Sequence, residues 1–271
     1  MSPGRLVPHG WAGVIGPAGV TALVLAETVA GGLVLLFCSP LWAEVKRGFF
    51  TLTGSVLLGL SAATWASVAA GRIEGNDAGA WCLRLAIGLT IALLLEVVFL
   101  LLRRPAPARF LGFVSVALSA ALLVAMAGTA EGSLAVALLQ LLAGAAFLGA
   151  VMDGLLLGHW YLTDRGLTRT PINRTTNLLL AGVALEAAAL ILGGFGPIEA
   201  SSEFNPLLTS AGLASWIALG MVATTALIAV MIRLTLRGPR SSAVQAATGF
   251  FYLAVITAMT AEFAAKVRFL P

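Results

Sequence analysis

The stretch LAVALLQLLAGAAFLGAVMDGLLLGHWY, residues 134–161, decides the class of this protein. It is longer than the roughly 20 apolar residues that a helix needs to cross the hydrocarbon core of a bilayer. Asp153 and His159 interrupt it near its end, where almost every neighbour is Leu, Gly, Ala or Val. The run predicts a transmembrane helix, and its two ionisable side chains need a separate explanation.

The composition of the whole chain points to the same class. Of its 271 residues, 59% are hydrophobic and 10% are charged, whereas about 25% of the residues in an ordinary soluble domain are charged. So few polar residues cannot cover a soluble core, but a bilayer accepts apolar helix exteriors directly. The sequence therefore predicts an all-α, polytopic transmembrane helix bundle, folded as a single integral membrane domain over residues 1–271.

Eight apolar runs are long enough to span a bilayer. They lie near 17–37, 49–70, 83–102, 110–128, 134–161, 176–195, 208–232 and 244–264. The segments between them are short and rich in Gly and Pro. RRPAPAR at 103–109, for example, contains two prolines. Gly and Pro mark turns and loops between helices. The pattern predicts eight spans and leaves no room for a soluble domain.

The basic residues alternate between successive loops. Eleven of the sixteen fall in the first, third, fifth and seventh loops: Lys46, Arg47, Arg103, Arg104, Arg109, Arg165, Arg169, Arg174, Arg233, Arg237 and Arg240. Because cytoplasmic loops carry an excess of Lys and Arg, these loops are predicted to be cytoplasmic and both termini to be outside. The expected location is a bacterial cytoplasmic (inner) membrane. The same rule explains the computed pI of about 9.7, so no nucleic-acid partner is expected.

A weak internal similarity is visible between the two halves of the chain. Glu27 and Asp153 each precede a basic loop, and TAEGS at 129–133 resembles TAEFA at 260–264. Halves with an even number of spans share one orientation, so the similarity indicates a parallel four-plus-four repeat. Chance similarity among alanine-rich helices is the alternative explanation.

Four carboxylates lie deep within the predicted spans, namely Glu27, Glu96, Asp153 and Glu186, whereas Glu262 lies near the outer boundary of the last span. An ionisable side chain in the hydrocarbon costs about 2.5–3.5 kcal/mol on insertion scales, so it tends to be paired, protonated or turned toward a polar cavity. No Lys or Arg is expected at the same depth, and several of these acids are therefore expected to be neutral. They either form a proton path or polar cavity, or they hold the helices together through hydrogen bonds.

The end of the opening stretch reaches the predicted cytoplasmic interface. Trp160 and Tyr161 are typical of an aromatic belt there, but a belt explains His159 less well. A histidine has an ordinary pKa near cytoplasmic pH, so His159 and Asp153 are candidate groups of a quinone or proton site, with Tyr161, Trp160 and Arg165 as further contacts. Six residues at about 100° each place Asp153 and His159 roughly 120° apart on the helix, so neighbouring helices would have to complete such a site.

No Walker loop, dinucleotide fingerprint, HExxH, CxxC or GxSxG motif occurs, so nucleotide, zinc and soluble-type hydrolase chemistry have no support. Only one histidine lies near a span, and neither haem nor a metal is expected to be held by this chain alone. By architecture, and not by a shared motif, the chain resembles the quinone-interacting membrane subunits of bacterial redox complexes.

The predicted spans make the lipid bilayer a partner of this protein. Three functional hypotheses follow. The first is an integral subunit of a respiratory or redox complex that contacts quinone near the cytoplasmic interface, relays protons through the buried carboxylates and binds other subunits. The second is a proton- or ion-coupled secondary transporter of a small solute, for which buried acids and a repeat are usual ingredients. The third is a membrane anchor or scaffold without chemistry of its own.

Overall fold

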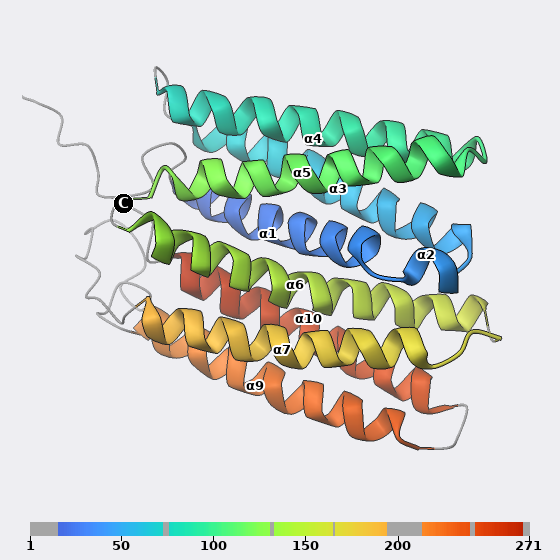
Figure 1. Ribbon diagram of the computed structural model, residues 1–271. Coiled ribbons are helices and arrows are strands. Elements are labelled where there is room, and N and C mark those ends of the chain that lie inside the picture. Colours follow the sequence, from blue (N-terminus) through green and yellow to red (C-terminus); the bar gives the residue numbers. More distant parts are fainter. Residues whose placement is uncertain are drawn as a thin grey trace, which may run out of the picture.

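A computed structural model describes residues 16–72, 76–130, 133–164, 166–193, 213–238 and 242–267 (Figure 1). The long helices are α1 (Gly16–Cys38), α3 (Arg47–Gly71), α4 (Asp77–Leu101), α5 (Pro105–Ala127), α6 (Leu134–Thr163), α7 (Thr170–Leu192), α9 (Leu213–Leu236) and α10 (Ser242–Val267), and a short helix, α2 (Leu41–Glu44), follows α1. All eight long helices are long and apolar enough to cross a membrane. The fold is therefore the predicted eight-span helical bundle.

Several helices begin earlier than hydropathy alone predicts. α4 begins at Asp77 and not near 83, because the Asn76 side chain accepts a hydrogen bond from the Ala78 N–H and caps the helix. α5 and α7 begin several residues before their predicted starts, with Pro105 and Pro171 in their first turns. Proline is favourable there because its missing N–H would have no partner within the helix. Of the predicted seventh span, residues 208–212 lie outside the described part of the chain.

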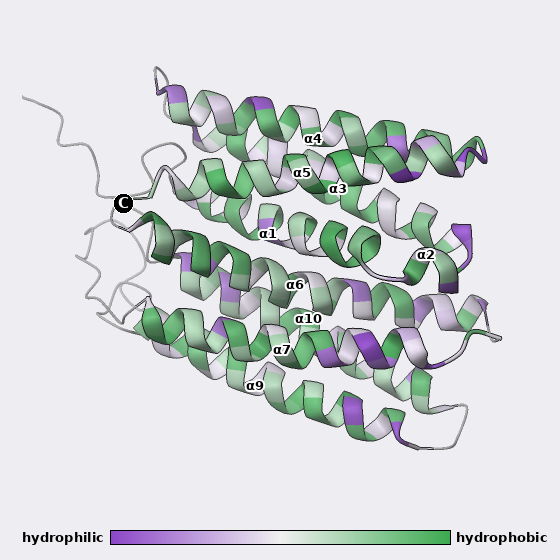
Figure 2. Cartoon of the chain, viewed as in Figure 1, coloured by the Kyte–Doolittle hydropathy of each residue, from purple (hydrophilic) through white to green (hydrophobic). Residues whose placement is uncertain are grey.

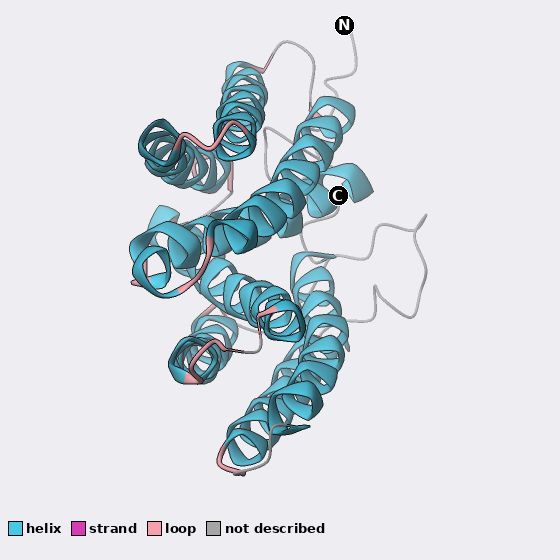
Figure 3. Cartoon of the chain, turned by 90° about the vertical axis from the view of Figure 1, so that its right-hand side faces the viewer, coloured by secondary structure: helices cyan, strands magenta, loops and turns pink. Residues whose placement is uncertain are grey.

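The bundle consists of two groups of four helices (Figures 1 and 3). In the first half, α1 packs on α3, α3 on α4, α4 on α5, and α5 back on α1. In the second half, α6, α7, α9 and α10 form a ring of neighbours in the same order. The halves meet chiefly where α1 packs against α6. This arrangement is compatible with the predicted four-plus-four repeat, which stays a prediction.

The contact between α1 and α6 is a close crossing of two parallel helices. A Cβ atom at Gly31 would lie 1.7 Å from the Ala145 carbonyl oxygen, and one at Gly149 would lie 2.3 Å from the Gly31 carbonyl carbon. Only glycine allows two backbones to approach so closely. Glu27 of α1 lies beside Gly144 of α6. Gly144 is nine residues before Asp153 on the same helix. Glu27 and Asp153, the two acids that suggested the repeat, are therefore not at equivalent positions along this interface.

The connections that carry most of the basic residues lie at one end of the bundle, together with α2. We call this the α2 end (Figure 2). Arg47 and Arg169 stabilise the helices there in the same way, because each donates to backbone carbonyl oxygens at the C-terminus of a helix, α4 for Arg47 and α9 for Arg169. A cation at that position also interacts favourably with the helix dipole. The α2 end is the end predicted to be cytoplasmic.

Candidate functional site

An ion pair is buried where the two halves meet, on the side of the crossing away from the α2 end. Lys266 Nζ lies 2.8 Å from Glu27 Oε1 and 3.2 Å from Glu262 Oε2. The three side chains are 0–2% exposed. This finding corrects the expectation that no Lys or Arg lies at the depth of Glu27. The predicted last span ended at residue 264, whereas α10 continues to Val267.

Local sequence explains how these side chains come together. Glu262 and Lys266 are four residues apart on α10 and so lie on one face of that helix. Glu27 lies near the middle of α1, and Gly144 of α6 provides room for its carboxyl group, because a Cβ atom at 144 would lie 2.8 Å from Glu27 Oε1. Sequence reasoning missed Lys266 as a partner, and the spacing of Glu262 and Lys266 was the available signal.

A third acid belongs to the same region. Glu186 on α7 is 2% exposed and interacts electrostatically with both Glu27 and Lys266. Glu27, Glu186, Glu262 and Lys266 are together called the ion cluster below. Among the described residues, the Glu27 and Glu262 carboxyl groups share the one ammonium group of Lys266, and uncompensated charge is costly in a desolvated site. The ion cluster therefore has the composition of a site that takes up protons or another cation.

Asp153 occupies a separate place beside α1 and α7. Its side chain is 2% exposed, and neither carboxyl oxygen accepts a hydrogen bond from a described residue. A Cβ atom at Gly32 of α1 would lie 3.7 Å from Asp153 Oδ1. Because Glu27 lies level with Gly144 on α6, the nine-residue separation places Asp153 about 13 Å nearer the α2 end. Asp153 and the ion cluster thus lie on opposite sides of the glycine crossing.

Glu96 lies within the first half, and the structure does not bring it near the ion cluster. It is fully buried on α4, whose main neighbours are α3 and α5. A Cβ atom at Gly54 of α3 would lie 3.3 Å from Glu96 Oε1. The four predicted acids therefore occupy three places: Glu27 and Glu186 share the ion cluster, while Asp153 and Glu96 are each separate.

His159 faces α10 and not Asp153. Its Nδ1 lies 3.0 Å from the Leu155 carbonyl oxygen, and its Nε2 forms a hydrogen bond with the Tyr252 hydroxyl. The two rings meet edge to face, with centroids 5.2 Å apart. A neutral imidazole that donates from Nδ1 and accepts at Nε2 satisfies both contacts. His159 and Asp153 therefore lie apart, as their angular spacing predicts.

The neighbouring aromatic residues also have structural partners. Trp160 packs near Phe49, with ring centroids 6.3 Å apart. The Tyr161 hydroxyl donates a hydrogen bond to the Thr168 carbonyl oxygen and so fixes the segment that leads into α7. Arg165, the fourth residue predicted to contact a quinone, lies outside the described part of the chain. Quinone contact at these residues stays a prediction.

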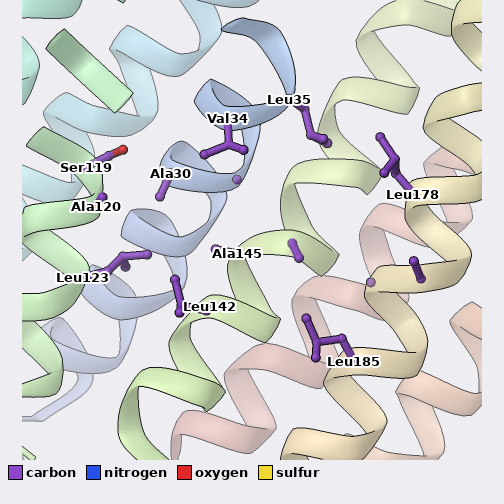
Figure 4. Close-up of a pocket in the computed structure, with 14 residues that line it drawn as sticks. Ala30, Val34, Leu35, Ser119, Ala120, Leu123, Leu142, Ala145, Leu178 and Leu185 are labelled. Carbon is purple, nitrogen blue, oxygen red and sulfur yellow. The ribbon is translucent and has the colours of Figure 1, made fainter. Parts of the chain in front are cut away.

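An apolar cavity of about 310 Å³ lies between α1, α5, α6 and α7 (Figure 4). Its lining includes Val34, Leu142 and Leu185, which are 40–53% exposed on the outer surface of the bundle. That surface faces lipid in a membrane. Leu35 and Leu178 line both this cavity and a smaller one that contains Asp153, so the lipid-facing cavity borders the Asp153 region.

Comparison of the chain with models of known protein families, with curated proteins and with solved structures found no match. Among the described residues, His, Cys, Asp and Glu side chains form no group of three that could hold a metal ion.

Proposed function

We propose that this chain is a membrane protein that moves protons across the bilayer and that the ion cluster is its proton-carrying site. The observation that carries the proposal is the burial of Glu27 and Glu262 within ion-pair distance of the buried Lys266, with Glu186 in electrostatic range. Such groups are rare inside membrane proteins, and proton pathways are one of the uses that retain them.

The charge balance explains how the ion cluster would work. Lys266 can neutralise the carboxylate of either Glu27 or Glu262, and the other of these two carboxyl groups is neutral only when it holds a proton. Proton arrival at Glu27 would favour pairing of Lys266 with Glu262, and proton arrival at Glu262 would favour pairing with Glu27. Because Glu27 belongs to the first half and Glu262 to the second, this exchange would change the ion pair that joins the halves.

The test is proton flux into vesicles that contain the purified protein. A potassium gradient with valinomycin supplies the driving force, and a pH-sensitive dye inside the vesicles reports the initial rate. Glu27→Gln and Glu262→Gln should each lower the rate at least about tenfold, because a positioned proton-transfer group contributes about 10²–10⁴-fold. Glu96→Gln is the matched control: it removes an equally buried acid outside the ion cluster and should retain the rate.

Two results would contradict the proposal. One is a rate for the normal protein no higher than that of protein-free vesicles. The other is normal flux in both Glu27→Gln and Glu262→Gln. A loss of flux in Glu96→Gln as large as in the cluster variants would mean that buried acids matter here through folding alone.

Quinone binding is a second candidate function, favoured by the lipid-facing apolar cavity that borders Asp153. The isoprenoid tail would occupy the cavity, and the ring would lie near Asp153 rather than near His159, whose nitrogens both have partners. A photoreactive quinone should then label α1 and α7 around Leu35 and Leu178. Labelling around Tyr252 instead would support the site predicted from the sequence.

A further inference from the structure

We infer that Asp153 is the proton acceptor on the α2 side of the crossing and that one bound water molecule connects it to the aqueous phase at the α2 end. The inference rests on the proposed proton movement, and it adds the place where protons enter or leave the bundle. It is carried by a small cavity, by the unpartnered carboxyl group that lines it, and by the polar surface beyond.

The cavity has the size and the lining that a water molecule requires. Its volume is about 10 Å³, close to the minimum of about 10–15 Å³ for one water molecule. Asp153, Ser39, Thr175 and Arg174 all line it. Neither the Asp153 carboxyl oxygens nor the Ser39 hydroxyl have a hydrogen-bond partner among the described residues. A buried water molecule is stable when two to four polar groups surround it, and this cavity provides that number.

Arg174 lines the cavity and pairs with a residue of a larger polar space at the α2 end. Its guanidinium group forms two hydrogen bonds with Glu44, of 3.0 Å and 2.8 Å. Both side chains are about 30% exposed. Glu44 in turn lines an open polar cavity of about 440 Å³, together with Lys46 and Asp164. The Arg174–Glu44 pair thus connects the lining of the Asp153 cavity with the polar surface at the α2 end.

The proposed route needs only water and the Asp153 carboxyl group. A hydronium ion in the aqueous phase gives a proton to the bound water molecule and becomes neutral water, and the bound water then gives one proton to an ionised Asp153 carboxyl oxygen and is itself left neutral. The reverse sequence returns the proton to the aqueous phase. The Ser39 hydroxyl orients the water by hydrogen bonding.

The experiment combines two readouts on the full-length protein in vesicles. Infrared difference spectra between acidic and alkaline buffer report carboxyl groups that gain or lose protons, and the flux assay reports transport. Asp153→Asn should remove one component of the carboxyl C=O band and lower proton flux at least about tenfold. Ser39→Ala keeps the acid but removes a hydrogen-bond partner of the water, so it should retain the band component and lower flux by a smaller factor. Glu96→Gln is the control for flux.

The outcomes separate this inference from the proposed function. Normal flux in Asp153→Asn, or an unchanged carboxyl band, overturns the inference, and the proposed function stands if Glu27→Gln still blocks flux. Normal flux in both cluster variants overturns the proposed function, while the band still decides whether Asp153 exchanges protons with the α2 end. If Asp153→Asn does not fold, normal flux in Ser39→Ala overturns the inference.

Discussion

Replacement of Gly31 by alanine should force the two halves of the bundle apart. The new Cβ atom would lie 1.7 Å from the Ala145 carbonyl oxygen and 2.9 Å from the Gly149 Cα atom. Carbon and carbonyl oxygen ordinarily approach no closer than about 3.3 Å, so the helices must separate by about 1.6 Å at this point. The clashing atoms belong to the backbone, and no side-chain rotation can relieve the clash.

The expected cost follows from two opposing effects. Overpacking of a well-packed interior costs about 1–3 kcal/mol, and a backbone clash belongs at the upper end of that range. Alanine regains up to about 1 kcal/mol because it is a better helix former than glycine. A net loss of about 2 kcal/mol remains, which corresponds to a fall in Tm of about 4–8 °C for a chain of this size.

Thermal unfolding of the purified protein in nanodiscs measures this effect. Gly59→Ala is the matched control, because Gly59 lies within α3 and a Cβ atom there would meet nothing within 4 Å. That variant should unfold at the normal temperature or slightly above it. Equal losses in the two variants, or a normal Tm for Gly31→Ala, would refute the argument that the glycine crossing holds the halves together.

Three further predictions follow from other parts of the structure. Lys266→Met should destabilise the protein by about 3–5 kcal/mol, because it leaves buried carboxylates uncompensated, and adding Glu27→Gln should recover part of the loss in thermal unfolding; no recovery would contradict the pairing. Tyr252→Phe removes the hydrogen bond to His159 and should cost about 1 kcal/mol with proton flux unchanged, whereas a tenfold loss of flux would place His159 on the proton path. Reporter fusions within 103–109 should behave as cytoplasmic, and an external signal would reverse the predicted orientation.

The number of spans and the inward position of the acids could be predicted from sequence because both depend on hydropathy. An apolar run must cover the bilayer, and an acid such as Glu96 or Asp153 is too costly to face lipid. The first residues of the helices were harder to predict from the sequence. The helices that begin at Asp77 and Pro105 start with polar residues or with proline. Such residues cap the free N–H groups of the first turn or, in the case of proline, lack an N–H group. An average of hydropathy places such residues in loops.

The ion cluster was harder to predict because its members come from three helices far apart in the chain. Only tertiary packing brings Glu27 and Lys266 together. From the sequence, a lysine near the end of the last span is interpreted as an ordinary residue of the membrane interface. The separation of Asp153 from His159 could be predicted, since it follows from helix geometry. The residues beside them, Gly32 next to Asp153 and Tyr252 next to His159, could not be predicted.

The ion pairs on the two sides of the glycine crossing lead to a final prediction. Glu27–Lys266 and Glu44–Arg174 each join the first half to the second, on opposite sides of a backbone contact too tight for water. Proton movement between the ion cluster and Asp153 therefore requires the halves to shift against each other. A short bifunctional thiol reagent that links Glu44→Cys to Arg174→Cys, with the exposed Cys38 replaced by serine, should stop proton flux. The flux of the same variant before linkage is the reference for this measurement. Flux that survives complete linkage would show that protons cross the bundle without movement between its halves.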